Sequence, residues 1–282
     1  MIISYLWLLA AEKRGRALFR SAKNLIREQL ISRRTWIGEG TRGSNVASLI
    51  ADLRPKFNKN GLRRFGPAGD GGYLMPDDLE GVRACVSPGV STEVGFDLEI
   101  ADRGIDVYLA DASVSGPPIE HARFHFTRKF FDIYNSDTTT TINDFCGGIQ
   151  DSDDLILEMD IEGAEYRVLA SAAEETMRRF RAMVIEFHDL DYLFSRVAFR
   201  EFSAVFSKLR RTHEVVHIHP NNGATALRCG ELRIPKLLEF TFYRNDRGTF
   251  EQKPLQFPHP LDTGNFPDMT PLVLPKCWYL KD

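Results

Sequence analysis

One stretch of the sequence decides the fold: Asp154-Leu155-Ile156-Leu157-Glu158-Met159-Asp160-Ile161-Glu162-Gly163-Ala164-Glu165-Tyr166. An apolar strand runs here into acidic residues and a glycine, and then into a helical segment. Glu158, Asp160 and Glu162 have the same parity, so in an extended chain their side chains project to one side. Since ligands of an open α/β sheet bind beyond the carboxyl ends of its strands, these acids are candidates for catalysis or metal binding. A plainer interpretation remains, in which Asp160 starts a turn and Glu162 and Glu165 favour a helix N-terminus.

The rest of the chain repeats this pattern. From Val82 onward, short apolar segments alternate with helical ones, which is typical of βαβ units and a mostly parallel sheet. A long helix is expected over 199–210, and a short strand with a helix cap over 138–144. Six prolines after Lys253 argue against a helix in the tail. The predicted strands cover residues 84–86, 105–110, 124–126, 155–159, 182–188, 214–219 and 237–243.

Two predicted strands end at residues suited to a nucleotide. The first ends at Gly89, where the missing side chain lets backbone N–H groups approach a ligand. The second ends at Asp111, about twenty residues later, where a carboxylate can accept hydrogen bonds from both ribose hydroxyls of a nucleoside. A turn or helix cap is the alternative role for Asp111. The spacing between the two residues favours the nucleotide role.

Polar side chains also lie at the ends of the later strands. Glu186 and His188 share one face of their predicted strand, and His217 and His219 share one face of the next. Together with Asp160, these oxygen and nitrogen ligands suit magnesium, manganese or iron better than a metal that prefers thiolates. We therefore predict a metal site with the ligands Asp160, Glu186, His188 and His219. The alternative is that these histidines are core residues with satisfied hydrogen bonds.

Several motifs resemble those of one enzyme family. Residues 160–165 resemble the DxEGxE motif of FkbM-family methyltransferases, which depend on S-adenosylmethionine (SAM). Residues 66–76 are similar to the GxxxDGGY motif of the family's GGY-containing branch, and residues 87–97 resemble its SAM loop. The resemblance covers residues 62 to 275 and includes further landmarks in the same order: Ile185-Glu186-Phe187-His188, Glu239-Phe240-Thr241-Phe242-Tyr243, Pro260-Leu261-Asp262 and Asn265.

This resemblance implies both a fold and a reaction. The fold is a Rossmann-like class I methyltransferase fold of the α/β class, with a mostly parallel seven-stranded sheet, an antiparallel last strand and helices on both faces. The reaction is transfer of a methyl group from SAM to a hydroxyl, with a sugar, polysaccharide or glycolipid as the expected acceptor. Such an in-line transfer requires the acceptor oxygen close to the methyl carbon and a group that removes its proton.

The resemblance and the strand order together assign the site residues. Asp160 is expected nearest the methyl group, with His188 or His219 taking the proton and Glu186 orienting the imidazole or a cation. The expected cofactor contacts are Gly89, Ser91, Glu93, Asp111, Ala112 and Asp160. The expected substrate contacts are Asp70, Gly72, Tyr73, Glu162 and Asn222.

Length and composition fit one α/β domain with a terminal extension. At 282 residues, with 43% hydrophobic and 27% charged residues, the chain can bury a sizeable core. The net charge is −3, but residues 1–36 carry +6 and the remainder −9, which argues against a nucleic-acid-binding body. Four cysteines, at 85, 146, 229 and 277, are too far apart for a CxxC metal knuckle, which favours a reducing cytosol.

The N-terminal segment is a separate feature. Residues 2–11 are apolar, but a bilayer span needs about twenty such residues, and the basic residues follow them instead of preceding them as in a signal peptide. We expect a basic amphipathic helix over 1–36, a methyltransferase domain over 37–253 and a proline-rich tail over 254–282 that wraps on the domain. Residues 1–34 either lie on an anionic membrane surface, with the protein cytoplasmic and peripheral to the inner face, or pack on the domain.

Two other functions remain open at this point. A metal-dependent hydrolase could use the same Asp, Glu and His residues on the same fold class, with water as the nucleophile. An inactive scaffold beside a membrane would use the basic N-terminal segment, but it has no use for Asp111, Asp160 and His188 together. We therefore expect a methyltransferase whose partner is a small-molecule or glycan acceptor and not a nucleic acid.

Overall fold

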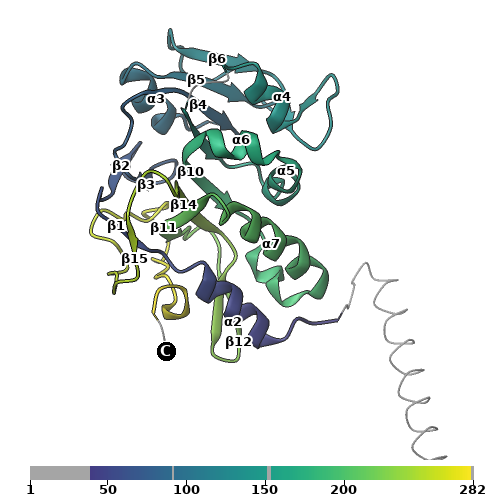
Figure 1. Ribbon diagram of the computed structural model, residues 1–282, viewed down its shortest axis with the longest axis vertical. Coiled ribbons are helices and arrows are strands. Elements are labelled where there is room, and N and C mark those ends of the chain that lie inside the picture. Colours follow the sequence, from purple (N-terminus) through teal and green to yellow (C-terminus); the bar gives the residue numbers. More distant parts are fainter. Residues whose placement is uncertain (1–38, 91, 151–153, 281–282) are drawn as a thin grey trace, which may run out of the picture. The chain divides into compact units, whose positions relative to one another are not determined.

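The computed structural model describes residues 39–90, 92–150 and 154–280 (Figure 1). The chain divides into a short unit, Met1–Gly40, and a larger one, Thr41–Asp282, which holds all the described helices and strands. The predicted N-terminal helix and its predicted membrane contact lie outside the described residues, and so does Ser91. No described helix combines the length and the apolar character that crossing a bilayer requires.

The larger unit is built around a seven-stranded sheet in the order β11-β14-β10-β9-β4-β5-β6. All strands point the same way except β14, which is antiparallel to both of its neighbours. The predicted mostly parallel sheet with an antiparallel last strand is confirmed, and the predicted strand ends differ from the observed ones by at most two residues. The strands are β4 (Val82–Pro88), β5 (Asp106–Ala110), β6 (Phe124–Thr127), β9 (Asp154–Met159), β10 (Phe180–Phe187), β11 (His213–Pro220) and β14 (Leu238–Arg244).

Helices cover both faces of this sheet, as expected (Figure 1). The predicted long helix is present as α7, and the predicted helix cap is Thr141, whose Oγ1 accepts a hydrogen bond from the Asp144 N–H at 3.1 Å. The helices are α2 (Gly43–Asp52), α3 (Gly95–Asp102), α4 (Ile142–Gly147), α5 (Glu165–Ser171), α6 (Glu174–Arg179) and α7 (Arg196–Leu209), with short 3-10 turns η1 (Leu190–Phe194) and η2 (Lys276–Trp278).

One face of the sheet packs against α4 to α7 through aromatic side chains. Phe187 of β10 contacts Phe206 of α7 with 4.7 Å between ring centroids. Tyr166 of α5 stacks on Phe202 of α7 at 3.6 Å. Pairs of this kind add about 1 kcal/mol beyond the burial of their area. They hold α5 against α7, and α7 against β10.

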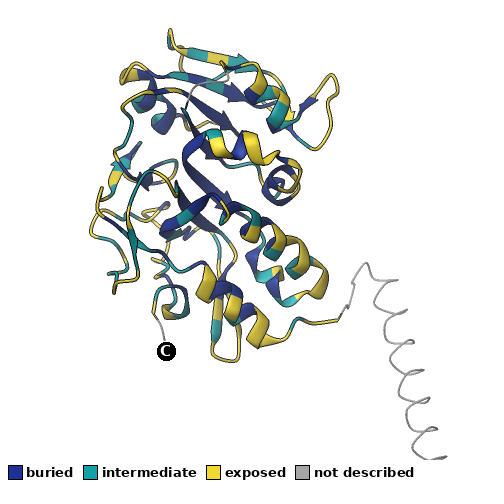
Figure 2. Cartoon of the chain, in the orientation of Figure 1, coloured by how far each residue is buried: buried dark blue, intermediate teal, exposed yellow. Residues whose placement is uncertain are grey.

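The other face is covered by α3 and by a hairpin of β2 (Arg63–Phe65) and β3 (Tyr73–Met75). Phe96 of α3 meets Tyr73 edge-on at 5.6 Å. Because layers cover both faces, every residue of β10 is buried, Glu186 included (Figure 2). An ionisable side chain in such a strand is costly unless it is paired, so its presence there points to a special environment.

Small two-stranded pairs and a long tail complete the unit. The tail after Lys253 contains no α-helix among its described residues, in agreement with its prolines. Trp278 is fully buried against the domain, and its Nε1 donates a hydrogen bond to the Arg233 carbonyl at 3.2 Å. The pairs are β1 (Phe57–Asn58) with β15 (Phe250–Glu251), β7 (Phe130–Phe131) with β8 (Thr139–Thr140), and β12 (Ala226–Cys229) with β13 (Leu232–Pro235).

Candidate active site

The carboxyl ends of β9 and β10 bring three of the four predicted catalytic residues together. Nε2 of His188 lies 3.8 Å from Asp160 Oδ1, 3.6 Å from Glu186 Oε1 and 3.4 Å from Glu162 Oε2. Its Nδ1 lies 3.2 Å from Oε1 of Glu165. One imidazole is thus surrounded by four carboxyl groups, as adjacent parallel strands with polar residues at their ends predict.

Glu165 organises this group from below. Its side chain is fully buried, and Oε1 accepts hydrogen bonds from the backbone N–H groups of Ile161 at 3.1 Å and Gly163 at 3.0 Å. The same oxygen faces Nδ1 of His188. Glu165 therefore fixes both the turn after β9 and the orientation of the imidazole, a role that sequence reasoning missed because an acid at a helix N-terminus has a simpler explanation.

The turns that follow the two strands have unusual backbone conformations. Glu162 and Asp189 have φ angles of 54° and 55°, in the left-handed region that residues with a side chain rarely adopt. Both residues flank the acidic group, one after β9 and the other after β10. Strained backbone of this kind persists where the surrounding structure holds it and is concentrated at functional sites.

The charges in this group shift one another's protonation. Burial alone lowers the pKa of His188, but the close contact with Glu165 and the charges of the nearby carboxylates raise it to about 9. Burial raises the pKa of Glu186 to about 9 and that of Asp160 to about 7. At neutral pH the imidazole is therefore charged and Glu186 is protonated, an arrangement found mainly where chemistry needs it.

A cavity of about 610 Å³ opens in front of these residues. Asp160, Glu186 and His188 line it, together with the predicted substrate contacts Asp70 and Glu162. Its volume lies in the range of about 300 to 1,000 Å³ that small-molecule ligands occupy. The other predicted substrate contacts do not line it.

The other three predicted substrate contacts, Gly72, Tyr73 and Asn222, are held by contacts within the chain. Both ends of the Asn222 amide are bonded to the backbone of Phe266, each at 2.9 Å, whereas the neighbouring Asn221 lines the cavity and donates to Glu186 Oε2 at 2.9 Å. Tyr73 is buried against α3. A side chain at Gly72 would come within 2.0 Å of the Pro67 carbonyl oxygen, so this glycine is needed to close the loop.

Four of the predicted cofactor contacts follow β4 or β5: Gly89, Glu93, Asp111 and Ala112. The reason for Gly89 differs from the expected one: its N–H donates to the Ala110 carbonyl at 3.0 Å, and a Cβ there would lie 1.7 Å from the Asp160 carbonyl oxygen. Glu93 is exposed and accepts a hydrogen bond from the Gly95 N–H at 2.7 Å. Gly89 therefore permits the close approach of two strand ends.

Asp111 is buried at the end of β5, and Ala112 beside it is half-buried. Oδ2 of Asp111 accepts a hydrogen bond from the Val90 N–H at 3.1 Å. Oδ1 of Asp111 accepts hydrogen bonds from the N–H and the hydroxyl of Ser113 at 2.7 and 2.6 Å. The turn-cap role considered above is thus present.

His219 is not part of the first group. Its Nδ1 lies 3.5 Å from Asp262 Oδ1, and among the described residues two sets of ligand atoms come within 4.8 Å of one another: Asp160, Glu162 and His188, and separately His217, His219 and Asp262. The predicted four-ligand metal site is therefore not assembled. The physical reason is that β14 lies between β10 and β11 and separates His219 from His188 by a whole strand.

That intervening strand contributes an acid that sequence reasoning left without a role. Glu239 of β14 is paired with Glu186 of β10 on one side and with His219 of β11 on the other. Burial raises its pKa, and Oε1 accepts a hydrogen bond from Asn265 at 2.6 Å. The sequence feature that indicates a special role for Glu239 is its carboxyl group in a mostly apolar strand.

Comparison with known proteins identifies the class. Residues 96–235 match the model of the methyltransferase FkbM domain. Together with the strand order, this makes the protein a SAM-dependent methyltransferase with the class I fold, rather than the hydrolase or the scaffold considered above. The chain contains a methyltransferase FkbM domain.

Similar folds occur among solved structures. They include a fibrillarin pre-rRNA processing protein of Methanococcus jannaschii (12% identity, 66% of this chain and 71% of that one, TM-score 0.36). They also include an rRNA methylase of Streptococcus thermophilus (10% identity, 71% and 93%, TM-score 0.33) and the N-methyltransferase NodS of Bradyrhizobium japonicum (10% identity, 59% and 88%, TM-score 0.30). A search of curated proteins found no match.

The site residues fit SAM. Asp111 follows β5, where a carboxylate can accept hydrogen bonds from a ribose, and the acidic group beyond β9 and β10 suits a cofactor that carries a sulfonium cation. One oxygen of Asp160 is buried without a hydrogen-bond partner among the described residues, which leaves it available to a ligand.

Proposed function

We propose that the protein transfers a methyl group from SAM to a hydroxyl of a sugar, polysaccharide or glycolipid. The observation that carries this proposal is the cavity in which Asp160, Glu186 and His188 converge. Sugar hydroxyls are hydrogen-bond donors, and carboxylates are acceptors that can select and orient them. The predominance of acids on the cavity wall disfavours phosphorylated acceptors at the reacting end.

When bound, SAM supplies an electrophilic methyl group. The protein's own part is to hold the acceptor oxygen in line with that group and to receive its proton. Asp160 would orient the acceptor through its unpartnered Oδ1. Glu165 holds Nδ1 of His188, so Nε2 faces the three other carboxyl groups and is the atom that would take the proton.

The imidazole must lose its own proton before it can act as a base. Its pKa of about 9 reflects the surrounding carboxylates, and a cationic ligand in the same cavity would lower it, because like charges disfavour the protonated form. His188 would then be neutral and able to accept a proton at Nε2. Glu186, which accepts a hydrogen bond from Asn221, would keep the imidazole in place.

A divalent cation is the second way to activate the hydroxyl. Asp160, Glu162 and His188 would hold Mg²⁺ or Mn²⁺ with two oxygens and one nitrogen. Bound there, such an ion would lower the pKa of the hydroxyl by polarising its oxygen.

The proposed setting is the cytoplasm, with the acceptor a small molecule or a glycan and not a nucleic acid. The charge of −9 outside residues 1–36 supports the exclusion of nucleic acids as acceptors, because nucleic acids repel a negatively charged surface. The +6 charge of residues 1–36 supports peripheral contact with anionic lipid, which would bring the enzyme to glycolipid acceptors. Removal of residues 1–34 should weaken binding to anionic vesicles, and added salt should weaken binding of the full chain.

Methyl transfer from labelled SAM to a panel of glycosides and glycolipids tests the proposal. His188→Ala should lower turnover by about 10²- to 10⁴-fold without weakening SAM binding, because a proton acceptor works mainly in the transition state. The matched control is His125→Ala, since His125 is an exposed residue of β6 at the far edge of the sheet. Full activity of His188→Ala on every accepted acceptor would remove this residue from the mechanism.

A chelator separates the two schemes for proton removal. Inhibition that Mg²⁺ or Mn²⁺ reverses supports the metal scheme, and indifference supports His188 as a direct base. Failure to methylate any hydroxyl, with transfer to an amine or a thiol instead, would contradict the proposed acceptor class.

A further inference from the structure

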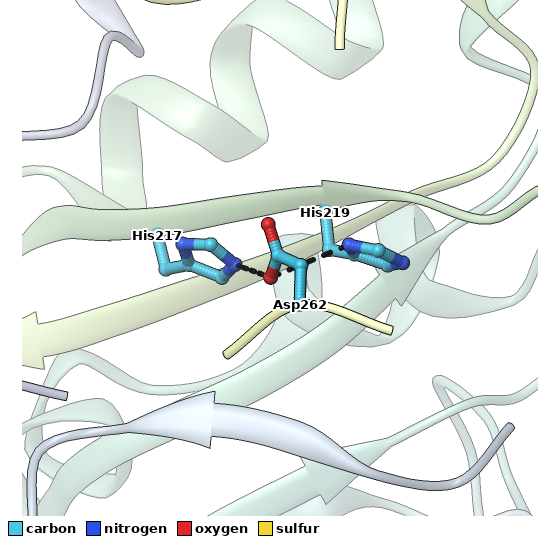
Figure 3. A group of neighbouring side chains, drawn as sticks. All are labelled: His217, His219 and Asp262. Carbon is cyan, nitrogen blue, oxygen red and sulfur yellow. Dashed lines mark hydrogen bonds and ion pairs between the residues drawn. The ribbon is translucent and has the colours of Figure 1, made fainter. Parts of the chain in front are cut away.

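We propose that His217, His219 and Asp262 bind one divalent transition-metal ion, best satisfied by Zn²⁺, which fastens the C-terminal segment to β11. Asp262 comes from the tail and lies between the two imidazoles, which project from the same face of β11 (Figure 3). The site is distinct from the active-site group, and the inference does not depend on which acceptor the enzyme methylates.

The geometry of the three ligand atoms suits a single ion. Nε2 of His217 lies 2.9 Å and Nδ1 of His219 lies 3.5 Å from the same oxygen, Oδ1 of Asp262. All three atoms lie within 4.8 Å of one another. Ligands held at about 2.1 Å from a tetrahedral Zn²⁺ are roughly 3.4 Å apart, so only small rotations separate this arrangement from a coordinated one.

The site is buried, and a hydrogen bond from a neighbouring residue orients Asp262. The side chains of His217 and Asp262 are 3% and 4% exposed, and that of His219 is 12% exposed. Oδ2 of Asp262 accepts a hydrogen bond from the His259 N–H at 2.7 Å, which leaves Oδ1 directed at the histidines. Metal ligands are typically oriented in this way by a second hydrogen bond.

His219 provides the strongest single argument for a ligand. Neither of its ring nitrogens has a hydrogen-bond partner among the described residues, although both are buried. Its Nδ1 faces Asp262 at 3.5 Å, too far for a sound hydrogen bond. A buried imidazole left in this state costs free energy, and a metal ion bound at one nitrogen would repay that cost.

The ligand set also favours one class of ion. Two imidazoles and one carboxylate are borderline ligands that suit Zn²⁺ and its neighbours, whereas Mg²⁺ and Ca²⁺ prefer oxygen alone. A fourth position is reachable because His217 and His259 line a second cavity of about 320 Å³ beside the tail. Water or His259 could complete a tetrahedron from that side.

The consequence of binding would be local order in the tail. The segment that carries Asp262 continues to Asn265, which donates hydrogen bonds to Asp70 at 3.1 Å and to Glu239 at 2.6 Å. Phe266, the next residue, lines the proposed acceptor cavity. An ion at His217 would therefore stabilise the wall of that cavity without touching it.

Metal titration of the full-length chain tests this inference. After dialysis against a chelator, the protein should bind one equivalent of Zn²⁺ by calorimetry, and Co²⁺ at the same site should give the visible absorption of a tetrahedral ion. His217→Asn and His219→Gln should each weaken Zn²⁺ binding by about 100-fold or more. Glu162→Gln is the matched control, because it changes the other candidate group and should leave Zn²⁺ binding intact.

Hydrogen exchange on the wild type covers the case in which a histidine variant fails to fold. Removal of Zn²⁺ should speed amide exchange in residues 259–266 and leave β4 and β5 unchanged. Absence of stoichiometric Zn²⁺ and Co²⁺ binding by the wild type would overturn the proposal and leave a hydrogen-bonded triad only. Binding that survives His219→Gln but is lost in Glu162→Gln would also overturn it, by moving the ion to the active-site group.

Discussion

The two halves of the sheet's carboxyl edge have opposite characters. At the ends of β4 and β5, the polar groups are used by the chain itself: Gly89 N–H is bonded to Ala110, and both oxygens of Asp111 accept hydrogen bonds. At the ends of β9 and β10, buried oxygens of Asp160 and Glu165 have no hydrogen-bond partner among the described residues. The groups named in the first half are satisfied by hydrogen bonds within the chain, whereas those in the second half have oxygens that a ligand can pair with.

This difference indicates that the two halves of the site have different functions. A rigid half can hold the nucleoside end of a cofactor in a fixed position, because its loops are already fixed by their own hydrogen bonds. An acidic half with unsatisfied groups is unstable by itself and gains stability from bound cations or hydroxyls. Three experiments test this division.

The largest effect is expected at Gly89. Gly89→Ala should lower the free energy of unfolding by about 3 kcal/mol or more, since its Cβ would lie 1.7 Å from the Asp160 carbonyl oxygen and its φ angle is +100°. Gly104→Ala is the control: its φ angle is +85°, but nothing lies within 4 Å of the added Cβ, so about 1 kcal/mol is expected. Urea unfolding of both variants measures this difference. Equal losses would mean that the two strand ends do not need their close contact.

A smaller effect is expected for cofactor binding. Asp111→Ala should weaken SAM binding by about 2 kcal/mol, because charge-assisted hydrogen bonds from the ribose are lost. Asp106→Ala, at the other end of β5, serves as the control, since Asp106 pairs only with exposed residues such as Arg123 and His125. Calorimetry with SAM and S-adenosylhomocysteine measures both. An unchanged affinity in Asp111→Ala would place the nucleoside elsewhere.

A third effect is expected in the pH dependence of stability. The pKa values of Glu186 and His188 are raised from 4.5 and 6.5 to about 9, so both groups stabilise the folded state at low pH and lose that contribution as pH rises toward 9. We expect the ligand-free protein to lose stability progressively between pH 6 and pH 9. Asp78 and Asp154, whose pKa values are lowered, change stability only at acid pH and do not interfere.

Urea unfolding at a series of pH values checks this expectation. The Glu186→Gln variant should show a shallower pH slope than the wild type, since one titrating group is gone while His188 and Asp160, whose pKa is raised to about 7, remain. Stability that rises from pH 6 to pH 9 would contradict the assigned protonation states. Addition of SAM should flatten the slope, because a cation in the cavity favours the ionised carboxylates.

The fold could be predicted almost completely from the sequence. Alternating apolar and helical segments predicted all seven strands of the central sheet, because the inner strands such as β9 and β10 are buried on both faces and therefore mostly apolar along their length. The polar exceptions at the ends of β9 and β10 stand out against that background. For this reason Asp160, Glu186 and His188 were identified together.

The rest of the site depends on contacts that no local pattern reports. His219 was grouped with His188 because strand spacing does not show that β14 lies between their strands. Asp262 belongs to a tail without periodicity, yet it meets His217, forty-five residues earlier in the chain. Gly89 was recognised as special, but its reason, the carbonyl of Asp160, lies on another strand. In each case the deciding neighbour is distant in sequence.

The position of β14 also bears on how the chain can be shortened and when it becomes active. The family match ends at residue 235, just before β14 (Leu238–Arg244) begins. A fragment cut there would leave β10 and β11 as unpaired edges, which invite aggregation, and would lack Glu239 and Asp262. During synthesis β11 has no partner in the sheet until β14 (Leu238–Arg244) has left the ribosome, so the enzyme gains its activity only after that strand has been made.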